Sequence, residues 1–227
     1  MSISFYPEPV PGEVAIARRK YGEYYQLGIW PYYPDIPLFQ VLKTTATLDP
    51  EKLVILHPKK MTMKELDDLT DKLATALTDL GAKKGRTISL YMWNSPEFVT
   101  AFFGILKTGA TVTALDPSFK EKDAQCQLDD SESIMVIVDE EQYHVIENIR
   151  EKLPMLENVI VVGEKRQLDS YLFKELIEKY PPNPPRVKTN PKKGLSGSSV
   201  HSWHNRPSKG LHAHALQHSE QHVPVSP

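Results

Sequence analysis

The sequence is poor in cysteine, in long apolar runs and in excess charge of either sign. One cysteine, Cys126, occurs in 227 residues, so no internal disulfide forms and a reducing compartment suits the chain. The formal net charge is −2, which gives no basis for nucleic acid or an acidic membrane as a partner. No run approaches the roughly 18 apolar residues of a membrane span. The start, MSISFYPEPVPGEV, lacks the features of a signal peptide. We therefore expect a cytoplasmic protein without an integral membrane segment.

Proline divides the chain into three regions. Residues 1–37 are rich in proline, tyrosine and tryptophan, and we predict an irregular arm that covers a larger body with its aromatic rings. A second break, PPNPPRVKTNPKK, opens residues 181–227 and is typical of a linker or loop. The regular patterns lie between the two breaks, in residues 38–180, which we predict to be the folded part of the chain.

Helix and strand patterns alternate through residues 38–180. A helix pattern starts at residue 38, and four more cover residues 61–81, 95–109, 140–153 and 168–180; a further helix follows Asp116-Pro117 and runs to about residue 128. Strand patterns fall at residues 53–56, 86–92, 110–115, 133–139 and 158–164. This alternation predicts an α/β fold, with a mainly parallel sheet, helices on both faces and right-handed crossovers.

The helix predicted over residues 61–81 is marked at both of its ends. Thr62 is placed to cap its first turn, and Glu65, three residues later, is placed to reach back to the cap. Leucines recur along it at spacings of three and four, which gives one apolar face. Gly81 stands where a left-handed residue ends a helix.

The next helix carries similar signals with a different surface. Ser95 is the predicted cap, Pro96 takes the first helical position and Gly109 ends the helix. The stretch between them, FVTAFFGILKTG, is apolar nearly all round. We therefore expect this helix to be buried on most sides.

Three segments, taken in order, resemble a known family. They are MTMKELDDLTDKLATALTDLGAKKG, ISLYMWNSPEFVTAFFGILKTGATVTALDPSF and QLDDSESIMVIVDEE. Together they resemble the N-terminal part of the AMP-forming acyl-CoA synthetases, a superfamily that includes luciferases and the adenylation domains of peptide synthetases. The ordered set NSPEF, GILKTGA and LDP is the most specific part. The resemblance implies that residues 38–180 form a partial AMP-binding N-terminal domain of the acyl-adenylate-forming fold.

The resemblance also implies a ligase chemistry in two steps, as in fatty acid metabolism. ATP and a small-molecule carboxylate give an acyl-adenylate and pyrophosphate, and the thiol of CoA then takes the acyl group; ATP, Mg²⁺ and CoA are the implied cofactors. Holding the ATP phosphates requires a flexible loop rich in Gly, Ser and Thr with a Lys. The family's loop resembles Thr-Ser/Ala/Gly-Gly-Thr-Thr-Gly-x-Pro-Lys-Gly and is expected soon after PPRVKTNPKK. It is absent there.

A histidine-rich stretch, SGSSVHSWHNRPSKGLHAHALQHSEQH, stands in its place and holds six of the eight histidines. Reading its codons from their second base gives a different amino-acid sequence. Trp203 has a single codon, TGG, and the His204 codon begins with C, so the shifted triplet is GGC, which encodes glycine. Residues 201–210 then read Thr-Ala-Gly-Thr-Thr-Gly-Leu-Pro-Lys-Gly within the freedom of the code. Residues 194–200 likewise read Asp-Leu-Ala-Val-Leu-Gln-Tyr, which is similar to the strand before the family's loop.

We infer a frameshift close to Lys193–Gly194. Residues 181–227 are then a linker followed by a disordered, out-of-frame tail, and the chain is a truncated N-terminal piece of an acyl-CoA ligase. No catalytic, cofactor-binding or metal-binding residue of the family is assigned to a position in this sequence, and no cofactor is expected for this chain alone. A programmed frameshift, with this chain as the short product of an active enzyme's gene, is an alternative origin.

A different class of function is a small non-enzymatic binding protein whose tail holds zinc or nickel. The candidate ligands are His201, His204, His212, His214, His218 and His222. The stretch has no cysteine and one acidic residue, Glu220, so we interpret it as a disordered tail rather than a built site. SGSS at 196–199 with Lys209-Gly210 lacks the glycine spacing of a phosphate loop and is rejected as one.

Other polar residues are interpreted as structural. Four acids of the helix over residues 61–81 are assigned to a solvated face: Glu65, Asp67, Asp68 and Asp71. Asp139-Glu140-Glu141 is interpreted as charge at a helix start. Cys126 lies in a polar helical stretch and is interpreted as a packed or idle thiol.

The inferred truncation has a physical consequence. A sheet cut off after Tyr180 leaves an edge strand and apolar helix faces without their partners. We therefore expect marginal stability and aggregation of the expressed chain.

Overall fold

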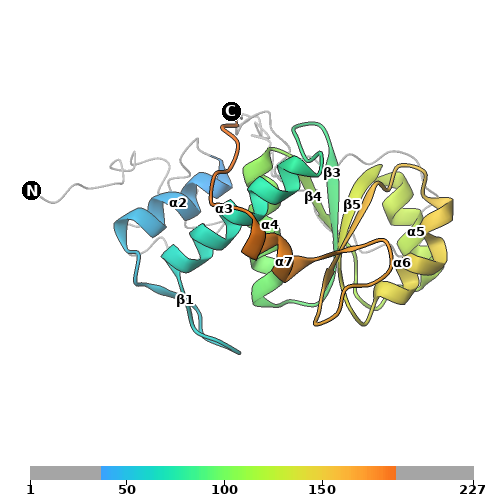
Figure 1. Cartoon of the computed structure of the whole chain (residues 1–227), viewed down its shortest axis with the longest axis horizontal. Coiled ribbons are helices and arrows are strands. Elements are labelled where there is room, and N and C mark those ends of the chain that lie inside the picture. The colour runs from blue at the N-terminus through green and yellow to red at the C-terminus, as the bar shows by residue number, and fades with distance from the viewer. Residues whose placement is uncertain (1–36, 188–227) are drawn as a thin grey trace, which may run out of the picture. The chain divides into compact units, whose positions relative to one another are not determined.

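The computed structural model describes residues 37–187, which form a parallel sheet with helices on both of its faces (Figure 1). The strands of this sheet are β3 (Thr87–Tyr91), β4 (Thr111–Ala114), β5 (Ser133–Asp139), β6 (Asn158–Val162) and β7 (Tyr171–Leu172). Their spatial order is β4-β3-β5-β6-β7, and every neighbouring pair is parallel. The predicted fold class is confirmed. The rest of the predicted arm and the predicted disordered tail lie outside the described residues.

Helices and a small hairpin surround the sheet. The helices are α2 (Leu38–Leu48), α3 (Met63–Asp79), α4 (Pro96–Thr108), α5 (Glu121–Asp130), α6 (Tyr143–Ile149) and α7 (Phe173–Lys179). Two short strands between α2 and α3, β1 (Leu53–Ile55) and β2 (Met61–Thr62), pair antiparallel apart from the main sheet. None of the helices within residues 37–187 has the length and apolar character that crossing a bilayer requires.

Two apolar cores lie on the two faces of the sheet, because successive residues of each strand point to opposite sides. Leu90 and Ile137 belong to the core under α3, α4 and α7. Val136 and Val138 belong to the core under α5 and α6. In Figure 1 these two groups of helices lie on opposite sides of the strands. Burial on both faces explains why β5 reads as the almost continuous apolar run SIMVIVD.

The helix starts follow the predicted capping chemistry. At α3 the Glu65 backbone N–H donates to Thr62 Oγ1 at 3.2 Å, and the Thr62 backbone N–H donates to Glu65 Oε2 at 2.8 Å. At α4 the Phe98 backbone N–H donates to Ser95 Oγ at 3.0 Å. These bonds satisfy N–H groups that have no partner inside the helix, and so they set where each helix begins.

The two predicted glycine stops are also confirmed. Gly81 has a φ of 101° and Gly109 a φ of 80°, both in the left-handed region. The prediction for residues 168–180 is partly wrong, because that segment is not helical throughout. Tyr171–Leu172 pairs with Ile160 and Val161 as β7, and α7 begins only at Phe173. A two-residue strand is too short to show alternation in sequence, so its pairing partner decides its conformation.

Candidate functional site

The loop that follows β3 meets the last residue of β5 at the carboxyl end of the sheet. The Trp93 backbone N–H, two residues beyond β3, donates to Asp139 Oδ2 at 2.8 Å. The chain leaves β3 through α4, on one face of the sheet, and leaves β5 through α6, on the other. This divergence makes the β3–β5 boundary a topological switch point, the place where open α/β sheets bind ligands.

Carboxylates occupy this edge of the sheet. Burial raises the pKa of Asp139 above its ordinary value, the negative charges of Glu141 and Glu97 add to the rise, and the Trp93 N–H opposes it. Glu140 directly follows β5, and its Oε2 accepts a bond at 3.0 Å from the backbone N–H of Glu164, which follows β6. Nucleotide phosphates need cationic or N–H donors. These acidic side chains do not make a phosphate site by themselves.

The interpretation of Asp139-Glu140-Glu141 as helix-start charge is wrong. Helix α6 begins at Tyr143, with no acidic residue in its first turn. Asp139 and Glu140 instead accept backbone N–H groups from the loops after β3 and β6. In the sequence these acids simply precede a helix. Only the pairing of neighbouring strands brings close the Trp93 and Glu164 backbone N–H groups that they bind.

We expect Asp139→Asn to leave the folded chain as stable as the wild type, or more stable, at neutral pH. A folded-state pKa above the unfolded one means that ionised Asp139 disfavours folding, whereas asparagine is never ionised and still offers an oxygen to the Trp93 N–H. The free-energy cost of ionised Asp139 is fully present at pH values above its folded-state pKa. It disappears as the pH falls below about 4, the ordinary pKa of an aspartate in the unfolded chain. Urea unfolding over a pH series measures the difference. Asp130→Asn, at an exposed position of α5, is the control. An advantage that grows toward acid would contradict this expectation.

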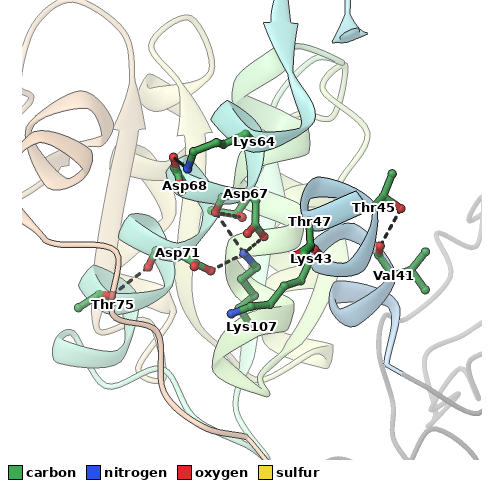
Figure 2. A network of polar contacts seen from close by, with 11 residues as sticks. Val41, Lys43, Thr45, Thr47, Lys64, Asp67, Asp68, Asp71, Thr75 and Lys107 are labelled. Atoms are coloured by element: carbon green, nitrogen blue, oxygen red, sulfur yellow. Dashed lines mark hydrogen bonds and ion pairs between the residues drawn. The ribbon is translucent and has the colours of Figure 1, made fainter. Parts of the chain in front are cut away.

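A buried lysine forms a cluster of ion pairs between α3 and α4. Lys107 lies near the end of α4 with its side chain 2% exposed, and it points at α3 (Figure 2). Its Nζ donates to Asp67 Oδ1 at 2.6 Å, to the Asp67 backbone oxygen at 3.2 Å and to Asp71 Oδ1. The three N–H donors of the ammonium are thereby all used. We name this set, Lys107 with Asp67 and Asp71, the α3–α4 ion cluster.

The assignment of Asp67 and Asp71 to a solvated face is therefore wrong. Their side chains are 15% and 12% exposed, because α4 packs over this side of α3. Asp68 does face solvent and pairs with Lys64 at 2.8 Å, as expected for a polar face. The sequence did contain a signal for this cluster. It has a lysine in a mostly apolar helix and two acids four residues apart on another helix. The cluster holds two helices together and leaves no free amine for catalysis.

The remaining candidates do not assemble a site within residues 37–187. Cys126 is an exposed thiol on α5, which fits the interpretation of an idle thiol rather than a packed one. In the described part of the chain no group of three or more His, Cys, Asp or Glu side chains is arranged to hold a metal ion. The six clustered histidines, the SGSS stretch and Lys209-Gly210 all lie outside that part.

Comparison with known sequences shows which family this chain resembles. The model of the family described as AMP-binding enzyme matches residues 42–197. A 3-hydroxybenzoate–CoA/4-hydroxybenzoate–CoA ligase of Thauera aromatica is 27% identical over 132 residues, which is 58% of this chain and 25% of that protein. Syringomycin synthase SyrB1 of Pseudomonas syringae pv. syringae is 30% identical over 121 residues, 53% of this chain and 20% of that protein.

Solved structures show the same arrangement of elements. The anthranilate–CoA ligase AuaEII, in complex with anthranoyl-AMP, superposes with a TM-score of 0.65 at 28% identity, over 71% of this chain and 31% of that one. The long-chain-fatty-acid–CoA ligase FadD1 from Archaeoglobus fulgidus gives a TM-score of 0.66 at 26% identity, over 73% and 34%. The chain therefore spans a quarter or less of these curated relatives and about a third of these structures.

Proposed function

The chain belongs to the family of AMP-binding enzymes, and from this premise we propose that it is the N-terminal piece of an ATP-dependent acyl-CoA ligase. The intact enzyme joins a small-molecule carboxylate to AMP, with release of pyrophosphate, and then passes the acyl group to the thiol of CoA. ATP, Mg²⁺ and CoA are its cofactors. Relatives named as CoA ligases for hydroxybenzoate, anthranilate and long-chain fatty acids support this reaction class.

The observation that carries the proposal is where the family match stops. It runs through residue 197 and so ends close to the inferred change of frame at Lys193–Gly194. Beyond that point the in-frame sequence is histidine-rich, while the shifted phase reads Thr-Ala-Gly-Thr-Thr-Gly-Leu-Pro-Lys-Gly at residues 201–210. A phosphate loop needs glycines that let backbone N–H groups approach the nucleotide, and a lysine that neutralises its charge. The shifted phase supplies both.

The 227-residue chain alone is expected to be inactive in adenylation. The described carboxyl edge of the sheet presents the carboxylates of Asp139 and Glu140, which repel phosphate rather than bind it. We expect ATP–pyrophosphate exchange by the purified chain to stay at background with aromatic and fatty carboxylates. The product of the frame-restored gene should exceed that background by roughly several orders of magnitude. ATP–pyrophosphate exchange that increases in proportion to the concentration of the 227-residue chain would contradict the expected inactivity.

The gene itself provides the direct test of the frame. Sequencing the DNA through the codons of residues 194–227 and beyond should find the phosphate-loop codons in the neighbouring phase, followed by an open frame. An immediate stop, or codons that do not spell the loop, would sink the proposal.

We extend the proposal to organisation and location. Residues 1–37 are an arm, residues 38–180 are the partial AMP-binding domain, and residues 181–227 are a linker with an out-of-frame tail. The cytoplasm is the proposed compartment, because a reducing environment suits the exposed free thiol of Cys126.

A further inference from the structure

The small hairpin formed by β1 and β2 stands apart from the rest of the fold. Its strands pair with each other and with no strand of the main sheet. Every one of residues 51–64 is at least partly exposed, and none of their apolar side chains belongs to either core. In Figure 1 the hairpin, in teal, extends beyond α2 and α3. Leu53 and Leu56 are therefore presented to the surroundings rather than packed.

The base of the hairpin is tied to the helix that follows it. The Met63 backbone N–H donates to the Lys52 oxygen at 2.8 Å, and the Lys64 N–H donates to the Pro50 oxygen at 3.1 Å. Thr62, the last residue of β2, is also the N-cap of α3. The tip thus projects from the start of a fixed helix, and docking it on a surface costs less conformational entropy than docking a free loop.

Positive charge is concentrated on the same hairpin. Residues 52–64, KLVILHPKKMTMK, contain four lysines and no acidic residue. Lys64 is paired with an acid of α3, whereas Lys52, Lys59 and Lys60 form no ion pair with any described residue. The net charge of −2 gave no basis for an acidic membrane as a partner, because a sum over the whole chain conceals this local excess.

Exposed leucines beside unpaired lysines match the chemistry of an anionic bilayer surface. A leucine enters the boundary between headgroups and acyl chains, while lysine stems lie along that boundary and keep their ammonium groups among the lipid phosphates. A protein partner would have to offer an apolar pocket and a carboxylate opposite each lysine. A bilayer with anionic lipids presents negative charge over its whole surface, with hydrocarbon directly beneath.

We propose that the β1–β2 hairpin is a peripheral docking element for anionic lipid bilayers. Leu53 and Leu56 enter the bilayer surface, and Lys52, Lys59 and Lys60 contact the headgroups. This inference goes beyond the proposed function and does not depend on the frame of the gene. The docking is weak and reversible, because few side chains take part in it.

Flotation with lipid vesicles tests the proposal on the 227-residue chain, and any aggregated chain sinks instead of floating. Vesicles of equal parts phosphatidylcholine and phosphatidylserine should carry the chain upward in a sucrose gradient, whereas vesicles of phosphatidylcholine alone should not. Added salt should release the bound chain, since it screens the attraction between lysines and headgroups. Equal flotation with both kinds of vesicle, or binding that salt leaves unchanged, would overturn the proposal.

A pair of lysine variants tests whether the charge of the hairpin matters by its position. Lys59→Gln with Lys60→Gln should weaken partition into the anionic vesicles by about tenfold or more. Lys120→Gln with Lys122→Gln makes the same change of net charge at exposed positions at the start of α5 and should weaken it much less. Equal losses from the two double variants would overturn the docking.

A pair of leucine variants tests the apolar contact in the same way. Leu56→Ser, at a side chain that is 68% exposed, should weaken partition by about fivefold or more. Leu168→Ser, at a side chain that is 76% exposed between β6 and β7, is the control and should leave partition unchanged. Both variants should keep the wild-type free energy of unfolding, which urea titration checks. Partition that Leu56→Ser does not weaken would overturn the insertion.

A fluorescent label provides a readout that does not depend on a loss of binding. Leu56→Cys in a Cys126→Ser background carries an environment-sensitive dye at the tip, and the wild-type chain carries the same dye on α5, at its exposed Cys126. Anionic vesicles should shift the emission to the blue for the tip label only. Equal shifts at both positions would overturn the insertion. Self-association that Leu56→Ser abolishes, without flotation of the wild-type chain, would assign the hairpin to a second copy of the chain and overturn the proposal.

Discussion

Lys107→Met is expected to destabilise the folded chain by about 3–5 kcal/mol, because it leaves two carboxylates without their shared cation in a buried place. Lys107 is 2% exposed, and its ammonium binds Asp67 and Asp71 of α3. Methionine fills a similar volume but supplies no donor. Domains of this size are stable by only about 5–15 kcal/mol, so the change removes a large part of the total. The free energy of unfolding, taken from urea titration, measures it.

Two further variants separate the effect of burial from the effect of charge on the free energy of unfolding. Lys64→Met removes the partner of Asp68 in an exposed pair and should change the unfolding free energy very little, because water screens both groups. A triple variant, Lys107→Met with Asp67→Leu and Asp71→Leu, removes the whole α3–α4 ion cluster and should recover most of the loss, since apolar replacement of a buried ion cluster is often neutral. Equal effects of Lys107→Met and Lys64→Met would refute the structural role of the cluster.

Gly104→Val is expected to cost about 3 kcal/mol through overpacking between α3 and α4. A β-carbon at Gly104 would stand 2.8 Å from Leu73 Cδ2 and 3.2 Å from Leu73 Cβ, so the two helices would have to move apart. Gly104→Ala should cost less, because it adds one carbon and gains helix propensity of about 1 kcal/mol over glycine. Urea unfolding of the series, glycine to alanine to valine, measures the trend.

The neighbouring leucine provides a cross-check on this close approach. Leu73→Ala alone should cost about 2–5 kcal/mol, because Leu73 is fully buried and its removal leaves a cavity. Combined with Gly104→Val, the loss should be smaller than the sum of the two single losses, since the valine fills the vacated space. Additive losses would show that the two residues do not compete for the same volume.

Local chemistry explains why much of the fold was predictable. Thr62 with Glu65, and Ser95 ahead of Pro96, satisfy helix N–H groups with side chains that lie three or fewer residues away, so the sequence contains both partners. Gly81 and Gly109 adopt a left-handed conformation that most other residues avoid. The parallel sheet followed from the alternation of helix and strand patterns.

The candidate site was predictable only in part. Tyr171–Leu172 became a strand because β6 offered it an unpaired edge, and no period in the sequence marks a strand of two residues. Asp139 meets the Trp93 N–H across 46 residues of chain, and Lys107 meets Asp71 across 36. Such pairings depend on the order of strands and on the packing of one helix upon another.

By itself, the sequence determined the kind and limits of most elements, the α/β class and the resemblance to acyl-adenylate-forming enzymes, because caps, glycine stops and apolar periods act over a few neighbouring residues. The tertiary structure alone decided that acids of α3 enclose Lys107, that carboxylates gather where β3 and β5 diverge, and that Val187 lies against Gly109. Charges and edges acquire partners only when distant segments meet, and the free energy of those contacts depends on burial that no single segment specifies.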